Sequence, residues 1–241
     1  RRTRNATAVD VAWAALIGAN ALVFAALGDG APVRRVLIAL LAAGWSFRLA
    51  AHLFVTRILR RAPEDGRYRT LRGAWGQGKF FVFYQAQALL TVVLAVPFLL
   101  ISANAAPAFS WLEVAGALLG LVALVGETTA DAELARFRAD PARRGQTCRS
   151  GLWRFSRHPN YFFEWLIWCA WALMALAAPH GWIALAAPAL MLVFIVRITG
   201  IPPTEAQALR TRGEDYRRYQ ETTSAFFPWF PRARRGGGTG G

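Results

Sequence analysis

The residues with the clearest chemical potential lie in the segment Gly151–Glu164, which reads GLWRFSRHPNYFFE. Its polar side chains lie on both sides of the boundary between a basic loop and a long apolar run. They are Arg154, Arg157, His158, Asn160, Tyr161 and Glu164. An uncompensated charge in hydrocarbon costs at least ~2.5 kcal/mol, so Glu164 requires a polar partner. A bound cofactor headgroup would provide one.

The local geometry of this segment predicts a helix that begins at Pro159. The residue before a proline avoids the helical region, so the loop ends at His158, and proline is harmless in the first turn of a helix. Asn160 and Glu164 lie four residues apart and share one face, with Tyr161 on a neighbouring face. The helix N-terminus, together with Arg157 and His158, would attract an anionic group.

Polar residues in three other apolar runs each have two readings. Asp10 could be an N-terminal charge favoured by the helix dipole or a buried acid that donates a proton. Arg48, four residues before His52, could extend to the interface or pair with an acid or a phosphate. Tyr84 could pack between helices or contact a substrate. Asp131 and Arg138 follow the fourth run, where they could be solvated or could hold ribose and phosphate.

The composition indicates an integral membrane protein. The chain has 241 residues, of which 55% are hydrophobic and 17% charged, with a mean hydropathy of +0.30. Soluble domains rarely combine these values. The formal net charge is +14, and the arginines that account for it lie between the apolar runs. They fit cytoplasmic loops and anionic lipid headgroups better than nucleic acid, which we do not expect as a partner.

The apolar runs predict an all-α polytopic membrane protein with about six transmembrane helices, seven being the alternative. Runs near 20 residues must be helices in lipid. The expected spans are Val9–Leu27, Val36–Phe54, Phe80–Leu100, Phe109–Thr128, Tyr161–Ala177 and Trp182–Thr199. We expect residues 1–231 to form one membrane domain and residues 232–241 to be a disordered tail or linker. Cys148 and Cys169 are expected to be free thiols, and no metal site is expected.

Loop charge predicts the orientation. The loops Thr56–Lys79 and Ala130–His158 are rich in arginine, whereas Ser102–Ala108 and Ala178–Gly181 contain no Lys or Arg. The positive-inside rule then places both termini in the cytoplasm, and a bacterial inner membrane is the expected location. The hairpin Gly28–Arg35 fits this rule least well, because Arg34 and Arg35 would lie outside.

A cytoplasmic amphipathic helix is expected after the last span, capped by Thr204, extending to about Glu221 and interrupted at Gly213. Its apolar side would carry Leu209, Tyr216 and Tyr219. Its arginines would face water or lipid phosphates, and they are Arg210, Arg212, Arg217 and Arg218.

The segment Gly151–Glu164 closely resembles the C-terminal signature of the steroid 5α-reductase family, in particular its bacterial branch of uncharacterised membrane proteins. The short matches Asp10–Trp13, Trp45–Arg48, Gly200–Pro202 and Ser224–Trp229 support the resemblance. Such reductases use NADPH to reduce a carbon–carbon double bond conjugated to a carbonyl in a lipid substrate.

The resemblance implies which residues hold NADPH. The family's cofactor-binding aspartate, arginine, asparagine and glutamate match Asp131, Arg138, Asn160 and Glu164. The resemblance also implies a contribution from the C-terminal helix near Glu205, and it matches an arginine of the early helices to Arg48. Arg157, His158 and Tyr161 complete the expected cofactor-binding set. Asp10, with Tyr84 as the alternative, would face the substrate carbonyl. The family's tyrosine in the first half is replaced by Trp45, which argues against a steroid substrate.

Two alternatives stay open. Isoprenylcysteine carboxyl methyltransferases, which use S-adenosylmethionine, share the Arg157-His-Pro-x-Tyr161 core and an acid such as Glu205. Asn160 and Glu164 favour the reductases. A lipid-binding membrane protein without catalytic activity is the second alternative. A lipid-like substrate and membrane lipids are the expected partners, and the oligomeric state is not readable from the sequence.

Overall fold

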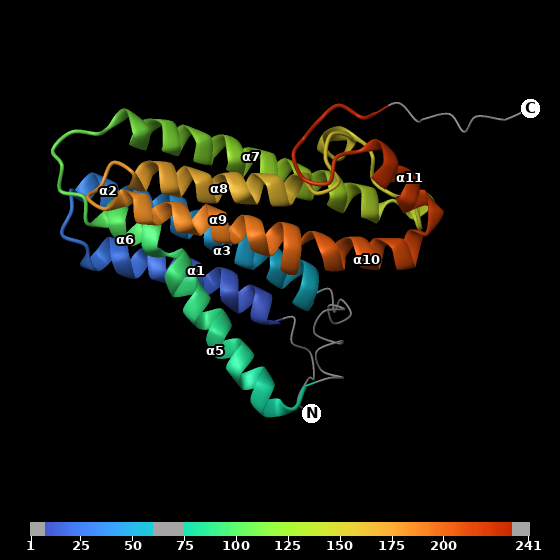
Figure 1. Cartoon of the computed structure of the whole chain (residues 1–241), viewed down its shortest axis with the longest axis horizontal. Helices are drawn as coiled ribbons and strands as arrows, with labels where there is room; N and C mark the ends of the chain where they lie inside the picture. Colours follow the sequence, from blue (N-terminus) through green and yellow to red (C-terminus); the bar gives the residue numbers. More distant parts are fainter. Residues whose placement is uncertain (1–7, 60–74, 233–241) are drawn as a thin grey trace, which may run out of the picture. The chain divides into compact units, whose positions relative to one another are not determined.

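A computed structural model describes residues 8–59 and 75–232, and these residues are mainly helical (Figure 1). Within this part of the chain, extended backbone pairs at one isolated parallel bridge, between Ser156 and Ser224. The all-α fold expected from the sequence is confirmed. The tail after Arg232 and the basic segment 60–74 lie outside the described residues.

Five helical stretches in the described part of the chain are long and apolar enough to cross a membrane. They are Ala8–Leu27, Pro32–Leu59, Gly78–Ser102, Trp111–Ala139 and Gly181–Arg212. A further apolar helix, α8 (Pro159–Ala175), has 17 residues, which is at the short end of the ~17–25 residues that a span requires. These helices support the interpretation as a membrane protein, and α8 lies where the fifth of the six spans was expected.

Packing divides the chain into two compact units. The N-terminal unit contains Arg1–Leu118 and Cys169–Ala189, and the C-terminal unit contains Leu119–Trp168 and Leu190–Gly241. Asp10, Arg48 and Tyr84 belong to the N-terminal unit, and all other predicted site residues belong to the C-terminal unit. That residues 1–231 act as one domain stays a prediction.

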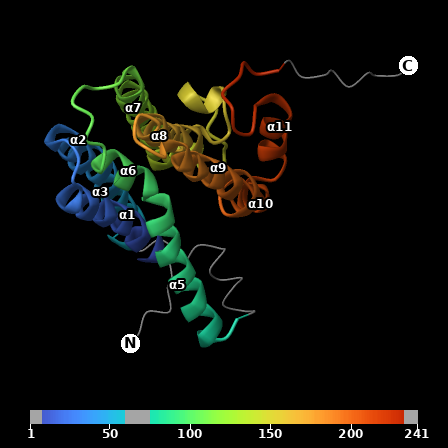
Figure 2. The same cartoon turned by 60° about the vertical axis from the view of Figure 1, so that its left-hand side comes forward.

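In the N-terminal unit, α1 (Ala8–Leu27) packs along α3 (Ala43–Leu53), as Figure 2 shows. Small residues allow the close approach, because Gly18 faces Ser46 and Phe47, and the Ser46 hydroxyl donates to the Ala14 carbonyl oxygen at 2.5 Å. The other elements of this unit include α2 (Pro32–Leu37), the π-helical segments η1 (Ile38–Ala42) and η2 (Phe54–Leu59), α5 (Gln77–Leu94), α6 (Val96–Ser102) and the 3-10 helix η5 (Gly181–Leu185).

Arg34, which the loop-charge argument left unexplained, is buried in an ion pair with Glu113. Its Nε and one terminal nitrogen lie 2.5 and 2.9 Å from the two carboxylate oxygens, and both side chains are at most 2% exposed. The same guanidinium donates to the carbonyl oxygens of Ala106 and Ala108. A fully hydrogen-bonded pair of this kind satisfies both charges inside the protein.

The C-terminal unit contains the greater part of α7 (Trp111–Ala139), the first turns of α8, the end of α9 (Ala186–Val193) and the π-helical segment η6 (Phe194–Ile198). Two further helices follow, α10 (Ile201–Arg212) and α11 (Glu214–Thr222), divided at Gly213 as expected. Tyr216 and Tyr219 form a buried cluster with Ala208 and Leu209, which confirms the predicted apolar side.

Two predictions for the C-terminal helix were wrong. Thr204 is not the cap, because α10 begins three residues earlier at Ile201, directly after Gly200. A Cβ at Gly200 would lie 2.6 Å from the Ile195 carbonyl oxygen, so only glycine allows the chain to leave η6 so closely. Arg212 does not simply face water, because it is half-buried with its guanidinium over the ring of Tyr216.

Candidate functional site

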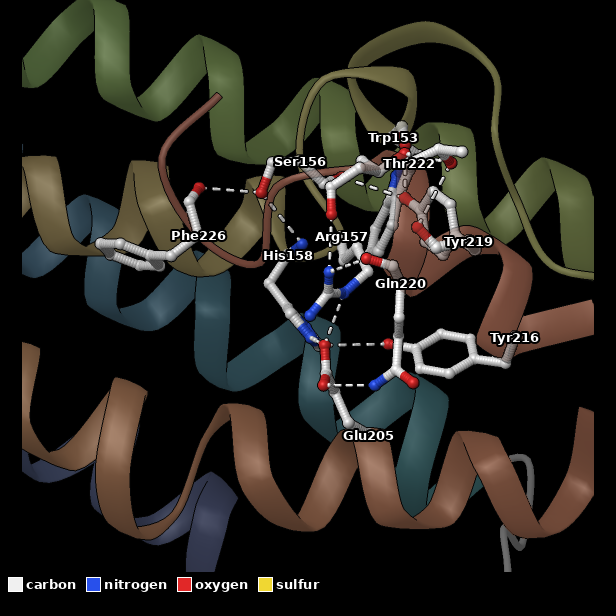
Figure 3. Close-up of polar contacts among 11 residues, drawn as sticks. Trp153, Ser156, Arg157, His158, Glu205, Tyr216, Tyr219, Gln220, Thr222 and Phe226 are labelled. Carbon is white, nitrogen blue, oxygen red and sulfur yellow. Dashed lines mark hydrogen bonds and ion pairs between the residues drawn. The ribbon is translucent and has the colours of Figure 1, made fainter. Parts of the chain in front are cut away.

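Glu205 on α10 is the centre of a polar cluster in the C-terminal unit (Figure 3). The Arg157 Nε donates to Oε1 at 2.7 Å, and the Gln220 side-chain amide donates to Oε2 at 2.7 Å. His158 Nε2 lies 3.3 Å from Oε1, and the Tyr216 hydroxyl donates to the same oxygen at 3.4 Å. Four side chains from two other segments of the chain therefore converge on one carboxylate.

Arg157 also fastens the end of α11. One of its terminal nitrogens donates to the carbonyl oxygens of Gln220 and Thr223, at 3.2 and 2.6 Å. Arginine has five N–H donors in a rigid fork, and here the fork joins Glu205 to the C-terminal backbone. Arg157 thus positions the cluster, and its expected contact with a cofactor phosphate stays a prediction.

The backbone after α11 lies along the loop before α8. The Arg157 N–H donates to the Ser224 carbonyl oxygen at 2.8 Å, and the Ser156 hydroxyl donates to the Phe226 carbonyl oxygen at 2.8 Å. The Trp229 N–H donates to the Phe155 carbonyl oxygen at 2.9 Å. These bonds hold Arg157 and His158, two of the four residues that contact Glu205, at a fixed place relative to α11.

His158 is buried at the start of α8 and is 3% exposed. Its ring stacks on that of Tyr161, with centroids 5.3 Å apart and planes 5° from parallel, and the Tyr161 hydroxyl lies 3.2 Å from the Thr204 hydroxyl. Burial lowers the pKa of His158 below its ordinary value, although the nearby Glu205 carboxylate acts in the opposite direction. A neutral imidazole with its hydrogen on Nε2 can donate to that carboxylate.

The lowered pKa of His158 predicts a pH dependence of stability. Below about pH 6.5, the unperturbed pKa of histidine, His158 binds fewer protons in the folded state than in the unfolded state. Its contribution to the free energy of unfolding is therefore complete above that pH and is lost as the pH falls. Thermal unfolding of the detergent-solubilised protein between pH 7.5 and 5.5 should show a falling midpoint. His158→Gln should flatten this slope, and an equal slope in the variant would contradict the assignment.

Asn160 and Asp131 connect α8 to α7. The Asn160 side-chain amide donates to an Asp131 carboxylate oxygen at 3.3 Å. The two helices approach closely because Gly126 has no side chain, and a Cβ there would lie 2.4 Å from the ring of Phe163. Glu164, one turn after Asn160, is half-buried, whereas Arg138 near the end of α7 is exposed.

The loop before α8 is held on α7 by Glu133. The Leu152 N–H donates to a Glu133 carboxylate oxygen at 2.9 Å, and the Trp153 indole N–H donates to the Ala130 carbonyl oxygen at 3.0 Å. Gly151 has a φ of +58°, and a Cβ there would lie 2.0 Å from the same Glu133 carboxylate. Only glycine permits this contact, which sets where the loop carries Arg157 and His158.

The structure brings together most of the predicted cofactor-binding residues in the C-terminal unit. Direct contacts join Arg157 and His158 to Glu205, His158 to Tyr161, and Asn160 to Asp131.

The three candidates in the N-terminal unit have other surroundings. An Asp10 carboxylate oxygen lies 3.8 Å from an Arg57 terminal nitrogen, and Tyr84 makes ring contacts with Phe80 and Phe83. Arg48 is half-buried in α3.

Sequence reasoning missed Gln220 and Glu133 and gave Tyr216 only an apolar role. Tyr216 and Gln220 lie four residues apart, so their shared helix face could have indicated a common partner. Glu133 had no such signal, because its contact with Leu152 depends on how the loop folds back.

Two comparisons with known proteins cover most of the chain. A family model described as "Protein of unknown function (DUF1295)" matches residues 1–223. An uncharacterised protein of Schizosaccharomyces pombe is 30% identical over 258 residues, covering 94% of this chain and 73% of that protein. No solved structure matches the chain.

Proposed function

The chain belongs to the family described as protein of unknown function DUF1295, and we propose that it is a membrane-embedded, NADPH-dependent reductase. The substrate would be a lipid with a carbon–carbon double bond conjugated to a carbonyl. The proposal is supported by the resemblance of Gly151–Glu164 to the steroid 5α-reductases and by the polar cluster built from that segment.

The observation that carries the proposal is the convergence of charged and hydrogen-bonding groups at the start of an apolar helix. Arg157 and His158 meet Glu205, while Asn160 meets Asp131 one residue into α8. Partly desolvated charges of this kind are costly unless they are paired or bind a ligand. A nucleotide offers phosphates for the basic groups, hydroxyls for the acids and an amide for Asn160.

The proposed roles follow from these chemistries. Asn160 and Glu164 would hold the nicotinamide end, Asp131 would accept from ribose hydroxyls, and Arg138 would contact a phosphate. NADPH, when bound, supplies the hydride that reduces the β-carbon of the unsaturated carbonyl compound. A proton must reach the α-carbon, and an acid that polarises the carbonyl oxygen would stabilise the enolate. Asp10, with Tyr84 as the alternative, is proposed for that acid.

The test is an assay of the purified full chain with NADPH and a panel of lipid enones. We expect loss of NADPH absorbance that depends on the enone, and a saturated product that carries deuterium from labelled NADPH at the β-carbon. Glu164→Gln should abolish cofactor binding without unfolding the protein. Binding of S-adenosylmethionine with no affinity for NADPH would refute the reductase function.

One contact favours a second candidate, an S-adenosylmethionine-dependent methyltransferase of the isoprenylcysteine carboxyl type. The acid near the start of the C-terminal helix, Glu205, lies against both members of the Arg157-His158 pair, and this residue set is what the chain shares with those enzymes. Calorimetric titration with each cofactor separates the two functions, since only one of them should bind in the micromolar range or below.

A further inference from the structure

Arg212, the last residue of α10, carries a charge for which the cluster offers no carboxylate. Its guanidinium carbon lies 4.9 Å from the centroid of the Tyr216 ring. Its Nε is buried, and among the described residues it has no hydrogen-bond partner. Arg212 as a whole is half-buried, but burying one of its N–H donors without a partner opposes folding, so this arrangement needs a reason other than stability.

Two acids of the same pair of helices, Glu205 and Asp215, are engaged elsewhere. Both oxygens of Glu205 accept from Arg157, Gln220 and Tyr216. Asp215, on α11, accepts from the side chain of Arg149 at 2.6 Å and from the Thr147 N–H at 2.8 Å.

The charges of this cluster therefore do not cancel. Arg157 and Arg212 contribute two positive charges for the single carboxylate of Glu205, and the charge of Arg212 also opposes protonation of His158. The cation–π contact with Tyr216 restrains the guanidinium. Of its three nitrogens only Nε is buried without a partner, so the two terminal nitrogens can donate to a ligand. An arginine held in this way is suited to a ligand with two anionic oxygens, which it can bind by two parallel hydrogen bonds.

We propose that Arg212 is the anion-binding residue of the Glu205 cluster and that it receives a phosphate or carboxylate of the bound cofactor. The inference rests on the proposed function in so far as the cluster holds a cofactor at all. The anionic group can come from two sources, a phosphate of NADPH or the carboxylate of S-adenosylmethionine, and the experiment distinguishes them.

The experiment measures binding of NADPH, S-adenosylmethionine and inorganic pyrophosphate to the purified full chain by calorimetry. Arg212→Gln should lower NADPH affinity by about 10-fold or more, as expected for loss of a charged hydrogen bond, and should lower pyrophosphate affinity in parallel. Arg212→Lys keeps the charge but not the two parallel bonds, so its affinity should be intermediate. Arg210→Gln is the matched control, because Arg210 is exposed on the same helix and its side chain donates to Gln207 of that helix.

A second measurement separates binding from a structural role. Without ligand, Arg212→Gln should unfold at the same temperature as the wild type or higher, because the variant removes a buried donor that lacks a partner. A clearly lower unfolding temperature would make Arg212 structural and overturn the inference.

The other outcomes of the binding experiment also support or overturn the inference. Equal NADPH affinity in wild type and Arg212→Gln overturns the inference but leaves the reductase function standing. Wild-type protein that binds S-adenosylmethionine and not NADPH, with affinity that falls in Arg212→Gln, supports the anion site and refutes the reductase function. Wild-type protein that binds none of the three probes overturns the inference.

Discussion

Glu205→Gln is expected to reduce the free energy of unfolding by about 3–5 kcal/mol, the range seen when one partner of a buried ion pair is removed. The Arg157 and Glu205 side chains are only 11% and 15% exposed, so water has little access to replace the lost carboxylate. All four side chains that converge on Glu205 lose a charged acceptor at once. Cofactor affinity should fall with stability, because Arg157 and His158 are no longer fixed relative to α10.

The measurement is equilibrium unfolding in mixed detergent micelles, followed by the far-ultraviolet circular dichroism of the helices. Glu214→Gln is the matched control. Glu214 pairs with Arg217 at 3.3 Å, but the two side chains are 75% and 66% exposed, and exposed pairs contribute little. If the two variants lost equal stability, Glu205 would not be the centre that holds the C-terminal unit together.

Glu113→Gln should destabilise the protein by a similar amount, about 3–5 kcal/mol, through an unrelated site. Arg34 would stay buried, with hydrogen bonds to the carbonyl oxygens of Ala106 and Ala108 but without its counter-charge. The loop between α6 and α7 would also loosen, because the Ser110 N–H donates to the same carboxylate at 2.8 Å.

Two further variants test whether charge or shape is responsible. The double variant Arg34→Met/Glu113→Leu should recover much of the loss, because apolar residues of similar volume can replace a buried ion pair. Arg35→Gln, at the neighbouring position, removes bonds to the carbonyl oxygens of Ala25 and Ala26 and should cost about 1 kcal/mol. A double variant less stable than Glu113→Gln alone would contradict this account of the pair.

The sequence by itself determined the helical membrane fold, because apolar runs near bilayer length leave the backbone no alternative to helix. It also determined the start of α8. Pro159 ends the loop at His158 and begins the helix. This is a local steric effect that does not depend on contacts with distant residues. The same holds for the break at Gly213, where the chain adopts a φ of +50°.

The partners of the polar residues could be predicted only in part. The motif Gly151–Glu164 was enough to identify Arg157, His158 and Asn160 as candidates, and the family resemblance added Glu205. That Arg157 and His158 both contact Glu205, 48 and 47 residues away, depends on the path of α9, η6 and α10. At Gly200 this path turns so tightly that a Cβ would touch the Ile195 backbone. The turn follows a π-helical segment, and apolar periodicity does not reveal such a segment.

The tertiary structure alone decided which charges are neutralised. Loop-charge counting places Arg34 and Arg35 outside the membrane, and the helical pattern turns Arg212 toward water or lipid phosphates, so both arguments treat these arginines as solvated. In the fold, Arg34 finds Glu113 and is fully paired, whereas Arg212 stacks on Tyr216 with its Nε buried and no hydrogen-bond partner among the described residues. Burial and pairing depend on contacts between residues far apart in the chain, and composition and spacing contain no measure of them.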